Sequence, residues 1–125
     1  MQMDNLREML RGKHKDSGEW VYGNRTTFTM NGKPISDVFL VCGDTHYSIL
    51  YYTLGKCVGT HDKNGKPLFE DDMVKCKDGI GVIEWDDFTS KYIIRIGNST
   101  VEFDKYNSTD LEIVGNTFDN LTGEG

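Results

Sequence analysis

Apolar and polar residues alternate in short runs along the second half of the chain, with the period expected of half-buried β-strands. Residues 72–77 alternate in this way, and residues 80–85 resume the alternation after the turn dipeptide Asp78-Gly79. Three further runs follow at residues 92–96, 100–104 and 111–114, with longer connections at 86–90 and 106–110. Five short strands with one long loop predict that residues 58–125 form an SH3-like five-stranded barrel.

The first half is less regular but still mostly extended. Candidate strands cover residues 19–22, 26–30, 38–42 and 46–53, and Asn31-Gly32 has the composition of a hairpin turn. In residues 3–11 the apolar positions follow helical spacing behind Asp4, and we favour a short helix or coil leading into a strand near Met9. The predicted fold is therefore mainly β, with an irregular N-terminal β region at 1–57 packed on the C-terminal barrel at 58–125. No repeat or long linker separates these regions, so we expect one compact unit or two small lobes.

Residues 58–72 read V-G-T-H-D-K-N-G-K-P-L-F-E-D-D, and they combine a turn with the entry to a strand. Asn64-Gly65 suits a tight turn whose central residues need φ > 0. Leu68 and Phe69 then resume an apolar run that Met73 and Val74 continue. This stretch is a structural signature and carries no evident chemistry.

Several blocks of the chain resemble, in order, the motifs of the YopX family of phage and prophage proteins. They are R-G-K at 11–13, G-E-W-V-Y-G at 18–23, T-L-G at 53–55, the stretch 58–72, G-V-I-E-W-D at 81–86 and L-E-I-V-G-N-T-F-D-N at 111–120. The resemblance implies a β-rich fold and an SH3-like barrel, but no established biochemical role. Asp71 stands where the family usually has the Gly of E-G-D, so a left-handed backbone there would cost Asp more than Gly. Cys57 and Val58 also depart from the family pattern, which usually has an aromatic residue and Thr before Gly59.

Composition fits a small protein of the cell interior. The 125 residues are 37% hydrophobic and 11% aromatic, enough for a core, and contain 14 glycines but only 2 prolines. No apolar stretch approaches the roughly 20 residues that span a bilayer, and the first residues lack the apolar segment of a secretory signal. Three cysteines without a disulfide-like spacing fit a reducing compartment. We therefore expect a cytoplasmic protein of a bacterial host cell, with no membrane contact.

Charge is divided unevenly between the two halves. Residues 1–57 carry 7 Lys and Arg against 6 Asp and Glu, a net charge of +1, whereas residues 58–125 carry 7 against 14, a net charge of −7. The acidic half argues against general nucleic-acid binding, which requires a basic face. A local basic cluster lies at Arg7, Arg11, Lys13, His14 and Lys15, and a solvated strand end is the interpretation we favour over a phosphate contact.

Two Cys-x-x-x-His spacings, Cys42 with His46 and Cys57 with His61, supply the ligand types of a tetrahedral zinc site. Structural zinc sites usually use tighter Cys-x-x-Cys knuckles, and both pairs here enclose glycine-bearing turns. A buried thiol and a turn histidine are the favoured interpretation. Whether the four residues converge on a metal is left open by the sequence, and we expect no cofactor.

Carboxylates cluster at Glu70-Asp71-Asp72 and at Glu84 with Asp86-Asp87, and we interpret both groups as solvated turn residues. The sequence contains no nucleophile elbow, phosphate-binding glycine loop or His-Glu-x-x-His, so we expect no enzymatic activity.

Among the 14 aromatic residues, Trp85 and Phe88 flank the second acidic group and are the first candidates for a surface patch. Alternation places Trp85 on the face of Ile83, which favours a core position for it. The candidate binding residues are thus Trp85, Phe88, Arg11 and Lys13.

The sequence favours a non-catalytic phage or prophage accessory protein that acts through protein contacts or self-association. Open sheet edges make a homo-oligomer the expected state, and the identity of any protein partner is not given by the sequence. The alternative is a nucleic-acid-binding module that uses the basic N-terminal segment and exposed aromatic residues, which we do not favour.

Overall fold

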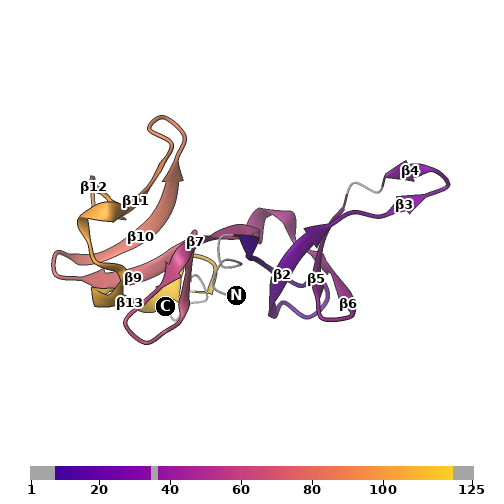
Figure 1. The fold of residues 1–125 in the computed structure, drawn as a ribbon, viewed down its shortest axis with the longest axis horizontal. Coiled ribbons are helices and arrows are strands. Elements are labelled where there is room, and N and C mark those ends of the chain that lie inside the picture. The colour runs from indigo at the N-terminus through magenta and orange to yellow at the C-terminus, as the bar shows by residue number, and fades with distance from the viewer. Residues whose placement is uncertain (1–7, 35–36, 120–125) are drawn as a thin grey trace. The chain divides into compact units, whose positions relative to one another are not determined.

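The computed structural model of the chain describes residues 8–34 and 37–119, and this part is mainly β. The chain divides into two compact units, residues 1–56 and residues 57–125 (Figure 1). Each unit has its own cluster of buried apolar side chains. The boundary falls inside strand β7 (Gly55–His61). The predicted mainly β fold is confirmed.

The N-terminal unit is built on four antiparallel strands in the spatial order β6-β5-β2-β1. These are β1 (Leu10–Lys13), β2 (Trp20–Thr26), β5 (Val38–Cys42) and β6 (Thr45–Ile49). The first two residues of β7 continue the pairing, since Gly55 lies opposite Arg11 and Lys56 opposite Leu10. Val21, Leu40 and Ile49 form the buried cluster of this unit.

A separate hairpin joins β3 (Thr29–Met30) to β4 (Lys33–Pro34). Its two central residues have φ angles of 56° at Asn31 and 79° at Gly32, as the left-handed turn of a two-residue hairpin requires. The turn predicted at Asn31-Gly32 is confirmed.

Other N-terminal predictions are confirmed only in part. The strand predicted at 38–42 has the observed bounds, and a strand does begin beside Met9, at Leu10; residues 1–7 lie outside the described residues. The strand predicted at 46–53 is wrong in its last part, because β6 ends at Ile49 and a 3₁₀ turn, η2 (Tyr51–Thr53), follows. The Thr53 hydroxyl donates to the Leu50 carbonyl (2.7 Å) and accepts from the Lys13 amide (2.8 Å), which closes this turn against β1.

The C-terminal unit contains the five predicted strands as one antiparallel sheet in the order β12-β11-β10-β9-β13. They are β9 (Asp72–Cys76), β10 (Gly79–Asp86), β11 (Lys91–Ile96), β12 (Ser99–Glu102) and β13 (Glu112–Asn116). Two 3₁₀ turns, η3 (Phe103–Lys105) and η4 (Ser108–Asp110), connect β12 to β13. Among the described residues, no pairing joins β12 to β13, so this sheet is open and the predicted barrel closure is not observed.

Sequence reasoning missed the hairpin of β7 and β8 (Pro67–Phe69) as a pair of strands. The register shifts between the Cys57–Phe69 and His61–Pro67 pairs, so β7 has no clean alternation to detect. The turn itself also differs from its prediction. Gly65 has a φ of 83°, but Asn64 does not share the left-handed conformation.

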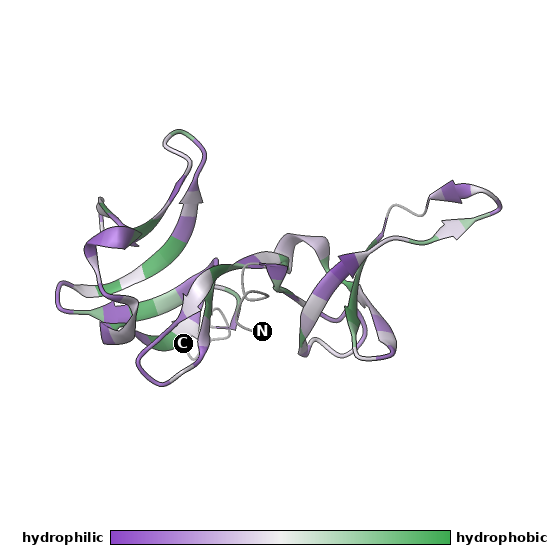
Figure 2. Cartoon of the chain, in the orientation of Figure 1, coloured by the Kyte–Doolittle hydropathy of each residue, from purple (hydrophilic) through white to green (hydrophobic). Residues whose placement is uncertain are grey.

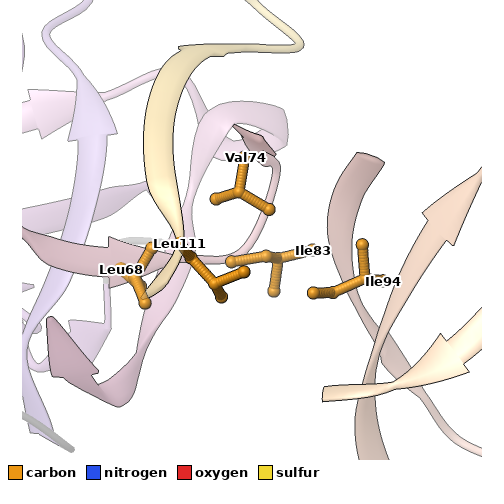
Figure 3. Close-up of a cluster of buried hydrophobic side chains, with 5 residues drawn as sticks. All are labelled: Leu68, Val74, Ile83, Ile94 and Leu111. Atoms are coloured by element: carbon orange, nitrogen blue, oxygen red, sulfur yellow. The ribbon is translucent and has the colours of Figure 1, made fainter. Parts of the chain in front are cut away.

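Five apolar side chains with no exposed surface form the core of the C-terminal unit and converge from four strands and a loop (Figure 3). They are Leu68, Val74, Ile83, Ile94 and Leu111. Ile83 and Ile94 lie directly opposite one another on β10 and β11. Apolar and polar residues are interspersed along the strands of this sheet (Figure 2), and buried positions alternate with less buried ones along β9 and β10, the pattern expected when one face of a sheet is buried.

In the part of the chain that the structure describes, no helix is long and apolar enough to cross a membrane.

Candidate functional site: the aromatic turn

The connection between β10 and β11 is a tight turn organised by one carboxylate. Asp86 pairs with Lys91 at the end of the ladder. Its Oδ1 accepts the Phe88 amide (3.2 Å), its Oδ2 accepts the Thr89 hydroxyl (2.8 Å) and its carbonyl accepts the Ser90 amide (2.8 Å). Ser90 adopts a φ of 57° to close the turn. These bonds fix the backbone on both sides of Phe88.

Phe88 is 97% exposed, and Trp85, three residues earlier, is 45% exposed. The Trp85 indole Nε1 donates to Asp87 Oδ1 (2.8 Å), and its ring meets that of Tyr92 edge to face, with centroids 4.9 Å apart. We call residues 85–90 the aromatic turn. Figure 1 shows the β10–β11 hairpin, which carries this turn, extending beyond the neighbouring strands of its sheet.

The core position favoured for Trp85 is wrong, although the face was predicted correctly. Trp85 pairs with Tyr92 on the face that Ile83 and Ile94 share. The core ends at the Ile83–Ile94 pair, however, and β10 continues past it. Alternation indicates which face a residue occupies, and not how far along the strand the core extends.

The other charged side chains near the aromatic turn form ion pairs with each other, so the uncompensated negative charge of the turn comes from two aspartates. On β10, Glu84 accepts from Arg95 Nε (3.1 and 3.2 Å) and Nη2 (2.7 Å), a contact that raises the pKa of the guanidinium. Lys91 pairs with Glu102 at 3.6 Å. Within the described residues, the donors to the Asp86 and Asp87 carboxylates are all neutral: an amide, a hydroxyl and an indole.

Glu70 contacts Tyr92, the ring partner of Trp85. The Tyr92 hydroxyl lies 3.3 Å from Glu70 Oε2. Burial, together with the negative charge of Glu70 and this hydrogen bond, raises the pKa of Tyr92 to about 12. The hydrogen bond to Glu70 orients the Tyr92 ring, which is one partner of the Trp85–Tyr92 pair.

Two carboxylates elsewhere in the C-terminal unit are buried, and both serve the backbone. Asp62 is 1% exposed and accepts the amides of Asn64, Lys66 and Ile113 at 2.9, 2.9 and 3.0 Å. Burial alone would raise the pKa of Asp62, but the three amide donors outweigh it and lower the pKa below its ordinary 3.8. Sequence reasoning missed this residue, although Asp two positions before Asn-Gly is a typical side-chain cap of a turn.

The second buried carboxylate is Asp72, which is 2% exposed and accepts the Phe69 amide at 2.8 Å. The prediction that Glu70, Asp71 and Asp72 are all solvated turn residues is therefore wrong for Asp72. Asp71 has a φ of 74°, which confirms that a left-handed backbone is needed where the resemblance placed a glycine.

The basic candidates lie in the N-terminal unit and pack on a tryptophan. Arg11 is only 5% exposed, and its guanidinium carbon lies 4.4 Å from the centroid of the Trp20 ring. Lys13 Nζ lies 5.3 Å from the same ring. The structure thus brings Arg11 and Lys13 together around Trp20, apart in sequence from the aromatic turn. A phosphate contact by these residues stays a prediction, and the burial of Arg11 does not favour it.

The four residues of the zinc hypothesis lie in different surroundings. Cys42 is exposed at the end of β5, and the His46 ring packs on Phe28 with centroids 4.7 Å apart. Cys57 is buried, and its sulfur accepts the Gly59 amide at 3.4 Å, while His61 Nδ1 lies 3.2 Å from the Asp62 carbonyl oxygen. Within residues 8–34 and 37–119, no group of three or more His, Cys, Asp or Glu side chains could hold a metal ion.

A groove of about 420 Å³ in the N-terminal unit was not anticipated from the sequence. Its lining residues are Lys15, Asp37, Val38, Ile49, Leu50, Tyr51 and Tyr52. Tyr51 and Tyr52 are 75% and 61% exposed. Lys15 and Asp37, which both line the groove, form an ion pair of 3.4 Å, so the charges of these two side chains compensate each other.

Fold and surface together define a mainly β protein whose most exposed aromatic side chain, Phe88, lies on a hydrogen-bonded turn beside a second exposed aromatic residue, Trp85. A family profile described as YopX protein matches residues 9–121, so the chain belongs to the YopX family. Comparison with curated proteins gives no match.

Proposed function

We propose that this chain is a non-catalytic accessory protein of a phage or prophage that binds a protein partner through the aromatic turn. The observation that carries the proposal is the 97% exposure of Phe88 on a turn whose backbone is held by Asp86. A large aromatic side chain in water is unfavourable, and buried aromatic anchors supply much of the affinity of protein interfaces. A turn that is already ordered also loses little conformational entropy on binding.

The surrounding chemistry supports binding over catalysis. The buried carboxylates Asp62 and Asp72 are bonded to backbone amides and hold the fold. At the turn, Asp86 is likewise engaged in closing the backbone. We infer that these carboxylates stabilise the backbone and take no part in catalysis. The lack of a catalytic motif in the sequence supports the same inference.

We also propose that the C-terminal unit is a partly open SH3-like barrel. After two 3₁₀ turns, β13 returns to pair with β9, the first strand of the meander. Such a return, from the last strand to the first, is what a partly open five-stranded barrel requires. Self-association would use the outer edge of β12, because the outer side of β13 is partly occupied by Asp62 and the Lys63 amide.

The test is affinity capture from infected host cells, with the full chain, Phe88→Ala and a matched control. Tyr51→Ala removes another exposed aromatic ring, 75% exposed, from the N-terminal unit. We expect a protein retained by the wild type and by Tyr51→Ala, and lost with Phe88→Ala. With the purified partner, Phe88→Ala should weaken binding by about 10-fold or more, as truncation of an interface anchor does. Equal binding by all three proteins would contradict the proposal.

Two further measurements separate the remaining proposals. A strict monomer in light scattering across micromolar concentrations would remove self-association. Titration with DNA and RNA at low salt tests the nucleic-acid alternative, whose affinity would fall steeply as salt rises. A flat titration would remove that alternative.

A further inference from the structure

The aromatic turn has the features of a site for a positively charged side chain. Trp85 presents an exposed indole, and the neighbouring Asp87 carboxylate is fixed to its Nε1. The electron-rich face of tryptophan attracts cations, most often the planar guanidinium of arginine. A carboxylate beside that ring adds a charged hydrogen-bond acceptor for the same guanidinium.

The N-terminal unit of this chain already shows such an arrangement in its own packing. Arg11 and Lys13 lie 4.4 and 5.3 Å from the centre of the Trp20 ring. In the described part of the chain, no cation lies over Trp85, whose contacts are the Tyr92 ring and Asp87. The two cations of the paired strand β11, Lys91 and Arg95, are engaged by Glu102 and Glu84.

Charge points to the same kind of ligand. Residues 58–125 carry a net charge of −7, and two of their acidic residues, Asp86 and Asp87, lie within the turn itself. An approaching basic segment would be attracted at long range, whereas an acidic partner or a nucleic acid would be repelled. The exposed Phe88 ring offers apolar contact to the stem of the bound side chain or to its neighbours.

We propose that the aromatic turn recognises a basic, arginine-containing segment of a partner protein. One arginine side chain stacks on Trp85 and pairs with Asp87, while Phe88 packs against the segment beside it. This proposal rests on the proposed function and names the chemical class of the partner. A second copy of this chain and a nucleic acid are the occupants that it excludes.

The two tryptophans allow a direct test, since Trp20→Phe leaves Trp85 as the only indole. The probes are capped peptides of alternating Gly and Arg, and matched peptides with Lys or Gln in place of Arg. We expect saturable quenching or shift of the Trp85 fluorescence with the Arg peptide, weaker with Lys and absent with Gln. The apparent affinity should decrease as salt rises from about 25 mM to 200 mM.

Variants in the same background separate a site from general attraction to an acidic protein. Asp87→Asn and Phe88→Ala should each weaken the Arg peptide by about 3- to 10-fold. Asp104→Asn makes the same change in charge at an exposed position of η3 and should lower the affinity by less than about 1.5-fold. Equal weakening by Asp87→Asn and Asp104→Asn, or equal binding of the Gln peptide, would overturn the proposal.

Failure here is distinguishable from failure of the proposed function. A captured partner that depends on Phe88 but binds independently of salt and of Asp87 would leave the protein-binding function standing and refute the basic segment. Self-association that is lost with Phe88→Ala would assign the turn to a second copy and also refute it.

Discussion

At the scale of single residues, the left-handed backbone of Asp71 gives the first prediction. Its φ of 74° is held by the amide, which donates to the Ile83 carbonyl (2.8 Å), and by the carbonyl, which accepts the Thr117 amide (3.0 Å). Asp71→Gly and Asp71→Ala both remove the carboxylate, so they differ only in the Cβ. We expect the Gly variant to be more stable than the Ala variant by about 1 kcal/mol. Urea unfolding of both measures this, and equal stabilities would contradict the strain.

Asp62 gives the second prediction, because one carboxylate accepts three buried amides. Asp62→Asn replaces one acceptor oxygen with a donor and should lower the free energy of unfolding at pH 7 by about 2 kcal/mol. The bond to Ile113 joins residues 51 positions apart, so its loss should affect β13 as well as the β7–β8 turn.

The effect should depend on pH in a defined direction. The pKa of Asp62 is lower in the folded protein than its ordinary 3.8, so its ionised form stabilises the fold above that value. This contribution is lost as the pH falls through the folded pKa. The difference in stability between wild type and Asp62→Asn should therefore be full at pH 7 and shrink in strongly acidic solution. A difference independent of pH would show that the charge of Asp62 does not contribute.

At the scale of elements, Gly81 tests how closely β10 and β11 pack. A Cβ at this position would lie 2.5 Å from Ile94 Cγ2 and 2.7 Å from the Arg95 carbonyl oxygen. Gly81→Ala should destabilise the C-terminal unit by about 2 kcal/mol, because the carbonyl cannot move without disturbing the ladder. Ile80→Ala is the control on the same strand, since Ile80 is 51% exposed. Thermal unfolding followed by Trp85 fluorescence in the Trp20→Phe background should show a lower midpoint for Gly81→Ala and little change for Ile80→Ala.

Strands with one buried face were the elements that the sequence predicted best. Residues 72–114 yielded all five strands of the sheet, because Val74, Ile83 and Ile94 each lie in a short apolar run that a charged residue follows and a turn bounds. The hairpin of β7 and β8 was not predicted, because its register shifts and β8 has only three residues. Irregular pairing removes the period on which such a prediction depends.

The sequence allowed the residues of the candidate site to be identified, but it did not predict how exposed their side chains are. Trp85 and Phe88 could be singled out beside an acidic turn, yet burial of Trp85 depends on where Ile83 and Ile94 end the core. The sequence placed Arg11 in a solvated strand end, whereas Trp20 of the next strand packs on its guanidinium and contributes to its burial. Both outcomes arise from contacts between strands, which the periodicity of a single strand does not specify.

At the scale of the whole molecule, the chain has two separate apolar cores. The N-terminal cluster contains Val21, Leu40 and Ile49, whereas the C-terminal cluster contains five fully buried side chains. Each unit also contains one of the two tryptophans, Trp20 in the first and Trp85 in the second. Unfolding of each unit can therefore be followed separately in the Trp85→Phe and Trp20→Phe variants.

We expect two unfolding transitions in urea, with the N-terminal unit unfolding first. A unit of 56 residues with three fully or nearly buried apolar side chains is at the size where a single core gives only marginal stability. Residues 57–125 keep the β7–β8 hairpin pairs and all five strands of their sheet, so this fragment should fold alone. The second transition of the full chain should then match the unfolding of the fragment. Coincident transitions for the two tryptophans would instead show that the units fold as one cooperative body.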